Sequence, residues 1–360
     1  MNKNISKYIK SKYQALVLFS CLFAVVVVGL GAYTRLSDAG LGCPDWPGCY
    51  GFLTVPKNLS DMSLVEQNFA GAVVETGKAW KEMIHRYFAG TLGLMLLAIM
   101  LYSIYLFKSQ SVNPAKLKKH IIPLKLPIFL VLLVIFQAIL GMLTVTMALQ
   151  PLIVMGHLLG GFTILTLSSL LYFRITSKPI AGESTALIGY FSWCLIALVV
   201  LLIQIALGGW LAANYAAPYC VGLPLCSGDW QQTFSIFDVF QLPSPSSNYE
   251  FGVLSSEVRQ SIHLVHRFWA IVTATVIVFV AIRIWLQAQT RKIKNASVLV
   301  VVAVICQILL GGILVYWHFP ISIALAHNLM AAMLLISLIR LSYFIHKVRE
   351  GTSKIAKPIL

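Results

Sequence analysis

Two short stretches of the sequence share one polar pattern, at residues 82–86 (EMIHR) and 263–267 (HLVHR). In each, a histidine (His85 or His266) stands directly before an arginine and opens a long apolar segment. An ionisable side chain at the mouth of a membrane helix is costly, so it is a functional candidate. Imidazole is a common axial ligand of haem iron, and the chemistry expected of these stretches is metal ligation.

Two further histidines extend the pattern to four positions. His157 and His327 each follow a glutamine, Gln137 or Gln307, by 20 residues. Each half of the chain thus offers two histidines, and a pair of imidazoles across a helix bundle is how membrane cytochromes hold haem iron. Zinc would need further Cys, Asp or Glu ligands close by, which neither pair has. The predicted axial pairs are His85 with His157 and His266 with His327.

Other polar residues near these histidines have two interpretations each. His263 lies on the same helical face as His266, and the alignment of the two stretches favours His266 as the ligand. His318 has no counterpart in the first half and is interpreted as interfacial. Arg86 and Arg267 suit haem propionates because the guanidinium fork matches a carboxylate, but interfacial arginines also extend toward water without a ligand.

Four cysteines form two pairs with the same spacing, C-x5-C. Cys43 and Cys49 lie in one long loop, and Cys220 and Cys226 lie in another. Both loops are predicted on the oxidising side of the membrane, where disulfides persist, so a bridge is expected within each pair. Bracing of the loops explains both bridges. A redox role is also open for Cys43–Cys49, because a short exposed bridge is more readily reduced.

The elements that must position these residues are membrane helices. The chain has 360 residues, of which 59% are hydrophobic and only 11% charged, and its mean hydropathy is +0.84. A soluble protein would carry about twice this charged fraction, and roughly 20 apolar residues span a bilayer as a helix. The eight predicted spans are approximately residues 14–34, 84–107, 122–146, 152–173, 188–211, 262–285, 297–317 and 321–345.

Charge divides the connections between these spans into two sets. The long loops 35–83 and 212–261 hold most of the acids. The positive-inside rule places the other, basic set in the cytoplasm together with both termini. The formal net charge of +15 is thus explained by topology, and nucleic acid is excluded as a partner. The basic set comprises residues 1–13, 108–121, 174–187, 286–296 and the tail after Ile345.

The first four spans correspond to the last four. Because each half has an even number of helices, both copies insert with the same orientation, as in parallel membrane repeats. The predicted fold is an all-α membrane protein of eight transmembrane helices in two pseudo-symmetric four-helix bundles, residues 1–180 and 181–360. Without an Arg/Ser-rich transit peptide, the expected location is a bacterial inner membrane. A transporter is an alternative class for such a repeat, and it predicts no haem.

In its combination of motifs the sequence resembles the haem A synthase family over nearly its whole length. The resemblance implies eight helices, oxidation of a haem O methyl group to the formyl group of haem A, a substrate haem at His85 and His157, and a haem b at His266 and His327. The motifs are residues 34–47 (TRLSDAGLGCPDWP), residues 82–86, Gly156-His157, residues 263–267 and Ala326-His327-Asn328.

The resemblance also implies roles for residues outside the ligand pairs. Glu82 matches the family's carboxylate and is a candidate proton acceptor; capping of a helix start is the alternative. Cys43 and Cys49 match its redox cysteines. Expected partners are the lipid bilayer, haem O synthase as substrate donor and the cytochrome oxidase assembly pathway, and a homo-oligomer is compatible with the chain. A quinol-linked di-haem b electron carrier also explains four histidines, but gives no reason for Glu82 in one half only.

Overall fold

The computed structural model describes residues 3–112, 123–177, 180 and 182–355, and over these residues the chain is helical without a strand. Eight of its helices are long and apolar enough to cross a membrane. The prediction of an all-α membrane fold with eight spans is therefore confirmed. The spanning helices are α1 (Lys3–Leu36), α3 (Thr76–Val112), α4 (Lys125–Thr146), α5 (Pro151–Thr176), α6 (Tyr190–Ala213), α8 (Ser256–Gln287), α9 (Arg291–Tyr316) and α10 (Ile321–Ile355).

Two helices begin further out than the apolar runs indicate. Helix α3 begins at Thr76 rather than near residue 84, and α8 begins at Ser256 rather than near residue 262. Their first turns are polar, so hydropathy does not indicate where these helices begin. The start of α8 is instead marked by its N-cap, Ser255, which accepts a hydrogen bond from a backbone N–H of the first turn at 3.4 Å. The outer loop 35–83 is therefore shorter than predicted, and Glu82 lies inside α3 rather than at its start.

The outer loops contain short helices of their own. The first loop holds α2 (Leu59–Asn68), and the second holds α7 (Trp230–Thr233) with the 3-10 helices η2 (Ala217–Tyr219) and η3 (Asp238–Phe240). A further 3-10 helix, η1 (Thr185–Gly189), leads directly into α6. Both loops thus contain regular secondary structure of their own.

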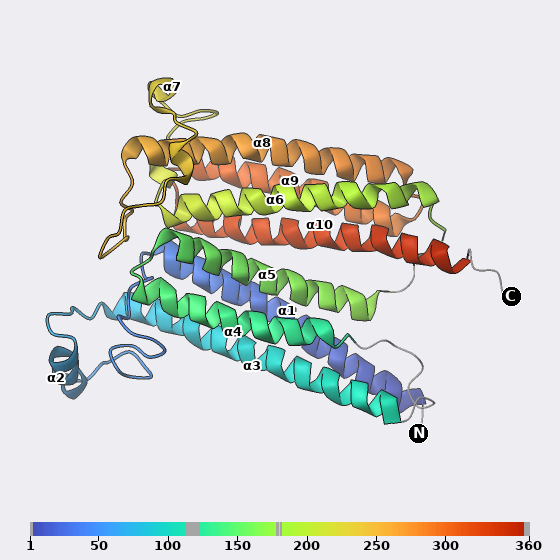
Figure 1. Cartoon of the computed structure of the whole chain (residues 1–360), viewed down its shortest axis with the longest axis horizontal. Coiled ribbons are helices and arrows are strands. Elements are labelled where there is room, and N and C mark those ends of the chain that lie inside the picture. Colours follow the sequence, from blue (N-terminus) through green and yellow to red (C-terminus); the bar gives the residue numbers. More distant parts are fainter. Residues whose placement is uncertain (1–2, 113–122, 178–179, 181, 356–360) are drawn as a thin grey trace. The chain divides into compact units, whose positions relative to one another are not determined.

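One compact unit contains α1, α3, α4 and α5, and it consists of residues up to Ile175 together with Pro245–Glu250 (Figure 1). Helix α3 packs on both α1 and α4. The Gln14 side chain donates to the carbonyl of Ile175 at 2.7 Å, which ties α1 to α5. The segment Pro245–Glu250 comes from the second outer loop but belongs to this unit, because the Tyr249 N–H donates to the Ala148 carbonyl at 3.0 Å.

The other compact unit is a closed four-helix bundle of residues 176–244 and 251–360. Helix α6 packs on α8, α8 on α9, α9 on α10, and α10 back on α6. Fully buried aliphatic side chains such as Ile277, Ile284 and Leu338 fill its interior. Within this bundle α8 and α10 carry the second histidine pair. The predicted pseudo-symmetric relation of the two bundles and the cytoplasmic side of the termini stay predictions.

The same tight turn joins the last two helices of each unit. Ala148 and Leu149 between α4 and α5 have positive φ angles of 46° and 64°, and His318 and Phe319 between α9 and α10 have 57° and 64°. In both turns the second of these residues donates its N–H back to the preceding helix at 2.8 Å. His318 therefore has a counterpart after all, in Ala148, and its place is that of a turn residue.

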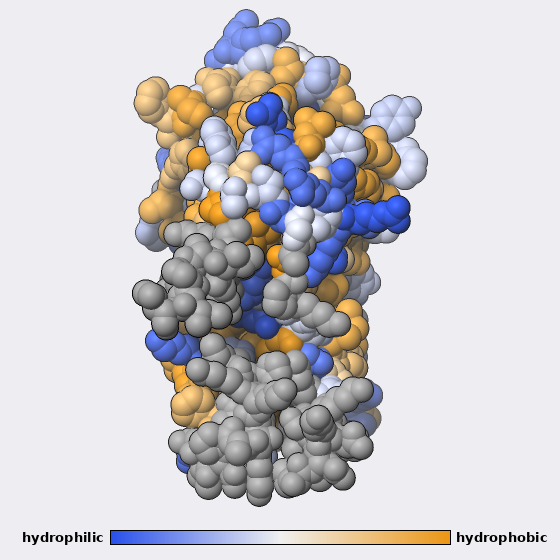
Figure 2. Space-filling view, turned by 90° about the vertical axis from the view of Figure 1, so that its right-hand side faces the viewer, coloured by the Kyte–Doolittle hydropathy of each residue, from blue (hydrophilic) through white to orange (hydrophobic). Residues whose placement is uncertain are grey.

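Basic side chains of the second unit lie at the helix ends opposite its long loop. Lys292 lies 4.5 Å from the ring centre of Phe344, and Lys294 lies 5.7 Å from that of Trp285. Figure 2 faces this end, where hydrophilic residues of the unit gather between hydrophobic flanks. The arrangement fits the predicted basic side of the membrane. Other residues of the predicted cytoplasmic set, Lys116, Lys118, Lys119, Lys178 and Lys357, lie outside the described residues.

Candidate functional site

The histidine pair of the first unit comes together across the bundle. His85 of α3 and His157 of α5 have ring centres 6.5 Å apart, with ring planes at 85°. Both side chains are half-buried, and the helices that carry them belong to one unit. Among the described residues, no group of three or more His, Cys, Asp or Glu side chains is placed to hold a metal ion. A site at this pair would therefore rest on two imidazoles.

A glycine on the neighbouring helix makes room for each imidazole of this pair. A Cβ added at Gly31 of α1 would lie 2.8 Å from Cε1 of His85, and one added at Gly141 of α4 would lie 3.2 Å from Cε1 of His157. Real Cβ atoms essentially never come within 3.0 Å of another heavy atom, and an approach of 3.2 Å is tighter than nine in ten real Cβ contacts. Each histidine is thus seated against a helix backbone that only glycine leaves open.

The second unit repeats this seating. A Cβ at Gly208 of α6 would lie 3.1 Å from Cε1 of His266, and one at Gly311 of α9 would lie 3.2 Å from Cε1 of His327. His266 and His327 lie close enough to influence each other electrostatically. The structure thus brings together both predicted pairs, while their role as iron ligands stays a prediction.

Glutamines accompany three of the four histidines. Gln137 Nε2 lies 2.9 Å from Nδ1 of His157, and Gln307 Nε2 lies 3.1 Å from Nε2 of His327. In α6, Gln204 Nε2 lies 3.3 Å from both ring nitrogens of His266. In the sequence Gln137 and Gln307 are markers of the repeat, and no role was predicted for Gln204. The signal that finds all three is Gln-x-x-x-Gly, with the glycine that seats the histidine.

Glu82 lies one turn before His85 on α3 and is buried, with 4% of its surface exposed. Its Oε2 accepts a hydrogen bond from the Cys43 N–H at 2.9 Å, and its Oε1 is paired with Nη2 of Arg86 at 2.5 Å. The carboxylate is therefore held on both oxygens. One partner comes from its own helix and the other from the first outer loop.

Arg86 joins this carboxylate to the loop. Its Nη1 donates to the carbonyls of Asp45 at 2.9 Å, Pro47 at 3.3 Å and Gly48. The Asp45 carboxylate in turn accepts two loop N–H groups at 2.6 and 2.8 Å. A planar fork that bonds several acceptors is what arginine offers and lysine does not. The pairing of Arg86 with a haem propionate stays a prediction.

The disulfide Cys43–Cys49 closes the same loop, as predicted. The expectation of an exposed bridge is wrong, because both cysteines are fully buried. The loop backbone packs directly on the start of α3: a Cβ at Gly42 would lie 2.6 Å from the carbonyl carbon of Lys78. The bridge is thus packed into the wall beside Glu82. A redox role for this bridge stays a prediction beside its structural role.

The second outer loop has an equivalent disulfide and a matching arginine on its helix, but a different residue stands at the position equivalent to Glu82. The predicted disulfide Cys220–Cys226 is confirmed. Arg267 donates to the carbonyls of Cys220 at 2.7 Å and Gly222 at 2.8 Å. His263 takes the position of Glu82, and its Nδ1 lies 3.0 Å from the carbonyl oxygen of Ala217. This unit therefore has no carboxylate one turn before His266.

Comparison with known proteins decides the family. The model of the COX15-CtaA family, described as cytochrome oxidase assembly protein, matches residues 14–339. A haem A synthase of Shewanella oneidensis is 42% identical over 341 residues, which cover 94% of this chain and 98% of the relative. The chain belongs to this haem A synthase family. A haem A synthase of Wolbachia pipientis is 27% identical over 379 residues, which cover 98% of this chain and 97% of the relative.

Membership of the family and eight membrane-length helices fit a multi-pass protein of the bacterial inner membrane with a role in cytochrome oxidase assembly. The resemblance drawn from the motifs is confirmed.

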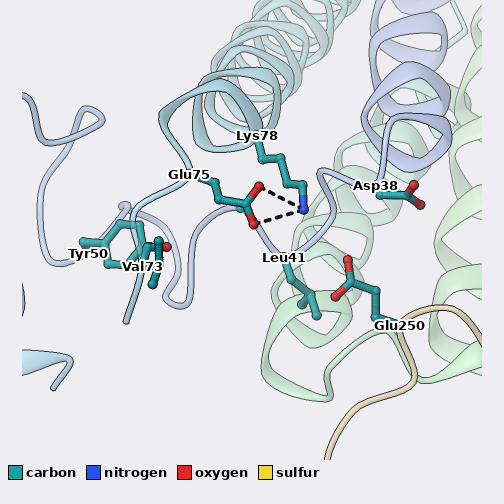
Figure 3. A pocket seen from close by; sticks show the side chains of 8 residues that line it. Asp38, Leu41, Tyr50, Val73, Glu75, Lys78 and Glu250 are labelled. Carbon is teal, nitrogen blue, oxygen red and sulfur yellow. Dashed lines mark hydrogen bonds and ion pairs between the residues drawn. The ribbon is translucent and has the colours of Figure 1, made fainter. Parts of the chain in front are cut away.

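A small cavity lies beside the first outer loop, but it is not a haem site. It has a volume of about 60 Å3 and is lined by acidic side chains, among them Glu75 and Glu250, with Lys78 paired to Glu75 at 3.1 Å (Figure 3). Such a volume holds a few water molecules. Burial, together with Glu75, Glu82 and Asp45 nearby, raises the pKa of Tyr50 at its wall.

Proposed function

We propose that this chain is an oxidoreductase of haem A biosynthesis that converts haem O into haem A, by oxidising one methyl group to a formyl group. One observation carries the proposal. A buried glutamate, Glu82, lies one helical turn from a histidine pair in a chain that is 42% identical to a named haem A synthase. The second histidine pair has no such carboxylate, which favours chemistry in the first unit.

The residues present fit a haem at each histidine pair. Two imidazoles on one iron have ring centres roughly 6 Å apart, because each metal–nitrogen bond is about 2 Å long. The rings of His85 and His157 are 6.5 Å apart. In the described part of the chain, Nδ1 of His85 and Nδ1 of His327 are buried without a hydrogen-bond partner. His85 and His157 would hold the substrate haem, and His266 and His327 would hold a resident haem b.

The reaction needs both electron and proton acceptors. Counted with water as the oxygen source, the change from CH3 to CHO releases four electrons and four protons. A haem b at the second pair would supply one-electron transfer. The proton acceptors must come from the protein or from water near the first pair.

Glu82 is the proton acceptor that the geometry favours. A general base has to be held within reach of the proton that it removes. Arg86 and the Cys43 N–H fix the two oxygens of Glu82, and each oxygen keeps a further lone pair. Because Arg86 is itself fixed by the carbonyls of Asp45 and Gly48, the outer loop sets the position of the base.

The proposed substrate implies partners in the membrane. Haem O carries a long apolar tail, so it is expected to reach the chain through the bilayer from a haem O synthase. The product would serve cytochrome oxidase assembly, the process named for the family. Formation of a homo-oligomer stays a prediction.

The direct test is conversion by the purified full-length protein in lipid nanodiscs. The protein is supplied with haem O, an electron acceptor and oxygen, and the pigments are extracted and identified by mass spectrometry. We expect haem A, and none from Glu82→Ala. Glu75→Gln is the matched control, because Glu75 is an exposed acid just before the same helix, and it is expected to convert normally.

Two other outcomes would favour the rival classes. A protein that binds two haems but forms no hydroxylated or formyl product is a di-haem electron carrier. A purified protein without a Soret band is neither an enzyme of haem nor an electron carrier, and this result would support the transporter. Full conversion by Glu82→Ala would refute the catalytic role of Glu82 but would still support haem O as the substrate.

A further inference from the structure

A glutamine stands four residues before the seating glycine in three of the four helices that face a histidine. The pairs are Gln137 and Gly141 in α4, Gln204 and Gly208 in α6, and Gln307 and Gly311 in α9. Four residues are about one helical turn, so each glutamine and its glycine lie on the same face. The equivalent residue before Gly31 in α1 is Val27.

Gln137 shows how closely such a glutamine is fitted to its histidine. Its Nε2 lies 2.9 Å from Nδ1 of His157 and also donates to the carbonyl of that residue. Gly160, one turn further along α5, leaves the space that the amide occupies, because a Cβ there would collide with Oε1 of Gln137. The amide is thus wedged between the ligand and the helix that carries it.

The other two glutamines reach their histidines in the second unit. Gln204 Nε2 lies 3.2 Å from the carbonyl oxygen of His266 and 3.3 Å from the ring nitrogens. Gln307 Nε2 lies 3.1 Å from Nε2 of His327. The side-chain oxygen of each is buried with no hydrogen-bond partner among the residues described.

These unpartnered oxygens matter for metal ligation. Half a rotation of an amide exchanges its oxygen and nitrogen, so each glutamine can accept a hydrogen bond from an imidazole N–H. Such a bond on one ring nitrogen fixes the tautomer, orients the ring and leaves the other nitrogen free for a metal. Each of the three glutamines can therefore act as the hydrogen-bond acceptor for the ring nitrogen that does not bind the metal.

His85 has no such partner. Val27 is buried and has no polar side-chain atom, so it can offer His85 only its backbone carbonyl. That carbonyl also belongs to the hydrogen-bond ladder of α1, so it is shared, whereas a glutamine amide is free to serve the imidazole alone. One turn further along, Phe88 stacks on Phe23 with ring centres 5.3 Å apart. The surroundings of His85 on this side are apolar.

We propose that Gln137, Gln204 and Gln307 are positioning residues that lock three of the four iron-ligating imidazoles, and that Val27 leaves His85 as the exchangeable ligand. This inference rests on the proposed function, because it assumes a haem at each pair. The exchangeable ligand then lies one turn from Glu82, in the unit to which we assign the reaction. The unit assigned to electron transfer has both ligands locked.

The test exchanges the two equivalent residues. Val27→Gln adds the missing amide in the first unit, and Gln204→Val removes the matching one in the second. The full-length protein, loaded with haem O, is reduced and titrated with carbon monoxide, which binds ferrous haem only when an axial ligand yields. The Soret change gives the dissociation constant, and extracted pigments report how much haem O and haem b each variant holds.

In the unchanged protein we expect carbon monoxide to bind the first-unit haem and to leave haem b unreacted. Val27→Gln is expected to raise that dissociation constant roughly tenfold, a typical effect of an outer partner on a metal ligand. Gln204→Val is expected to make haem b reactive toward carbon monoxide. Gln204→Glu keeps an acceptor of the same shape and should leave haem b closed.

The inference and the proposed function fail in different ways. Absence of haem O from the first unit, with haem b present, contradicts the proposed function. Normal pigment content with both haems equally closed to carbon monoxide overturns the inference, and so does Gln204→Val that stays closed. If Val27→Gln fails to fold, Gln204→Val still decides, because it needs no new polar group inside the bundle.

Discussion

The two units seat their histidines in the same way and differ in the residue one turn before the first ligand. In the first unit this residue is Glu82, which is tied to the outer loop through Cys43 and Arg86. In the second unit it is His263, whose Nδ1 lies 3.0 Å from the Ala217 carbonyl oxygen and whose ring packs on Phe319. The difference supports our proposal that one copy of a duplicated histidine frame carries the reaction, because only that copy has a carboxylate at this position.

The strongest way to break this comparison is to make the first unit like the second. Glu82→His puts the residue of the second unit into the first and removes the proton acceptor. We expect haem A formation to fall by about 10²- to 10⁴-fold, the usual share of general base catalysis, with haem content unchanged. Product assay and pigment extraction on the same preparation measure both, and haem A formation close to the normal rate would refute the role of Glu82.

The seating glycines offer a second test. Gly208→Val adds a side chain where a Cβ alone would lie 3.1 Å from His266. The imidazole must move, so we expect the haem b content to fall at least tenfold. Gly312→Val is the control in the same bundle, because no heavy atom lies within 4 Å of a Cβ there. Equal haem b in both variants, measured by the pyridine haemochrome, would contradict the proposed seating.

The two arginines sharpen the comparison at a smaller scale. Arg86→Lys cannot keep Glu82 and three loop carbonyls bonded at once, because an ammonium group lacks the guanidinium fork. We expect haem A formation to fall about tenfold. Arg267→Lys loosens the second loop, which has no carboxylate to position, and should change the rate by less than about twofold. A larger loss from Arg267→Lys than from Arg86→Lys would reverse the assignment of the units.

The disulfides give the smallest expected difference. Each bridge joins cysteines six residues apart, and in the loop-entropy account such a short loop contributes about 2 kcal/mol of stability. Replacing the first cysteine pair by serine should therefore lower Tm by about as much as replacing the second pair. Only Cys43→Ser with Cys49→Ser should also slow haem A formation several-fold, because that loop holds Glu82. Complete loss of conversion with normal Tm would instead indicate a redox role.

Hydropathy and charge predicted the number of spans, because each helix carries a long apolar run. The repeat predicted which histidines come together, since equal spacing along equivalent helices places them at the same depth. The outward extension of α3 was not predictable from hydropathy, because its first two turns are polar. As a result Glu82 was expected at a helix start, whereas it is inside the helix with its carboxylate covered by the loop.

Residues that act through packing were harder to foresee. Gln204 and Val27 lie in apolar spans, and their equivalence shows only when Gly208 and Gly31 are seen to seat the two histidines. The burial of Cys43 and Cys49 depends on Gly42, which allows the loop backbone to lie against Lys78. Such close approaches are properties of the folded chain and leave no periodic signal.

The central claim is that the first unit holds the substrate haem and the second holds haem b. The most direct measurement is pigment analysis of the purified full-length protein with either His157→Ala or His327→Ala, after loading with haem O. We predict that His157→Ala loses haem O and haem A but keeps haem b, whereas His327→Ala loses haem b and still binds haem O. Loss of the same pigment from both variants would contradict the division of labour between the two units.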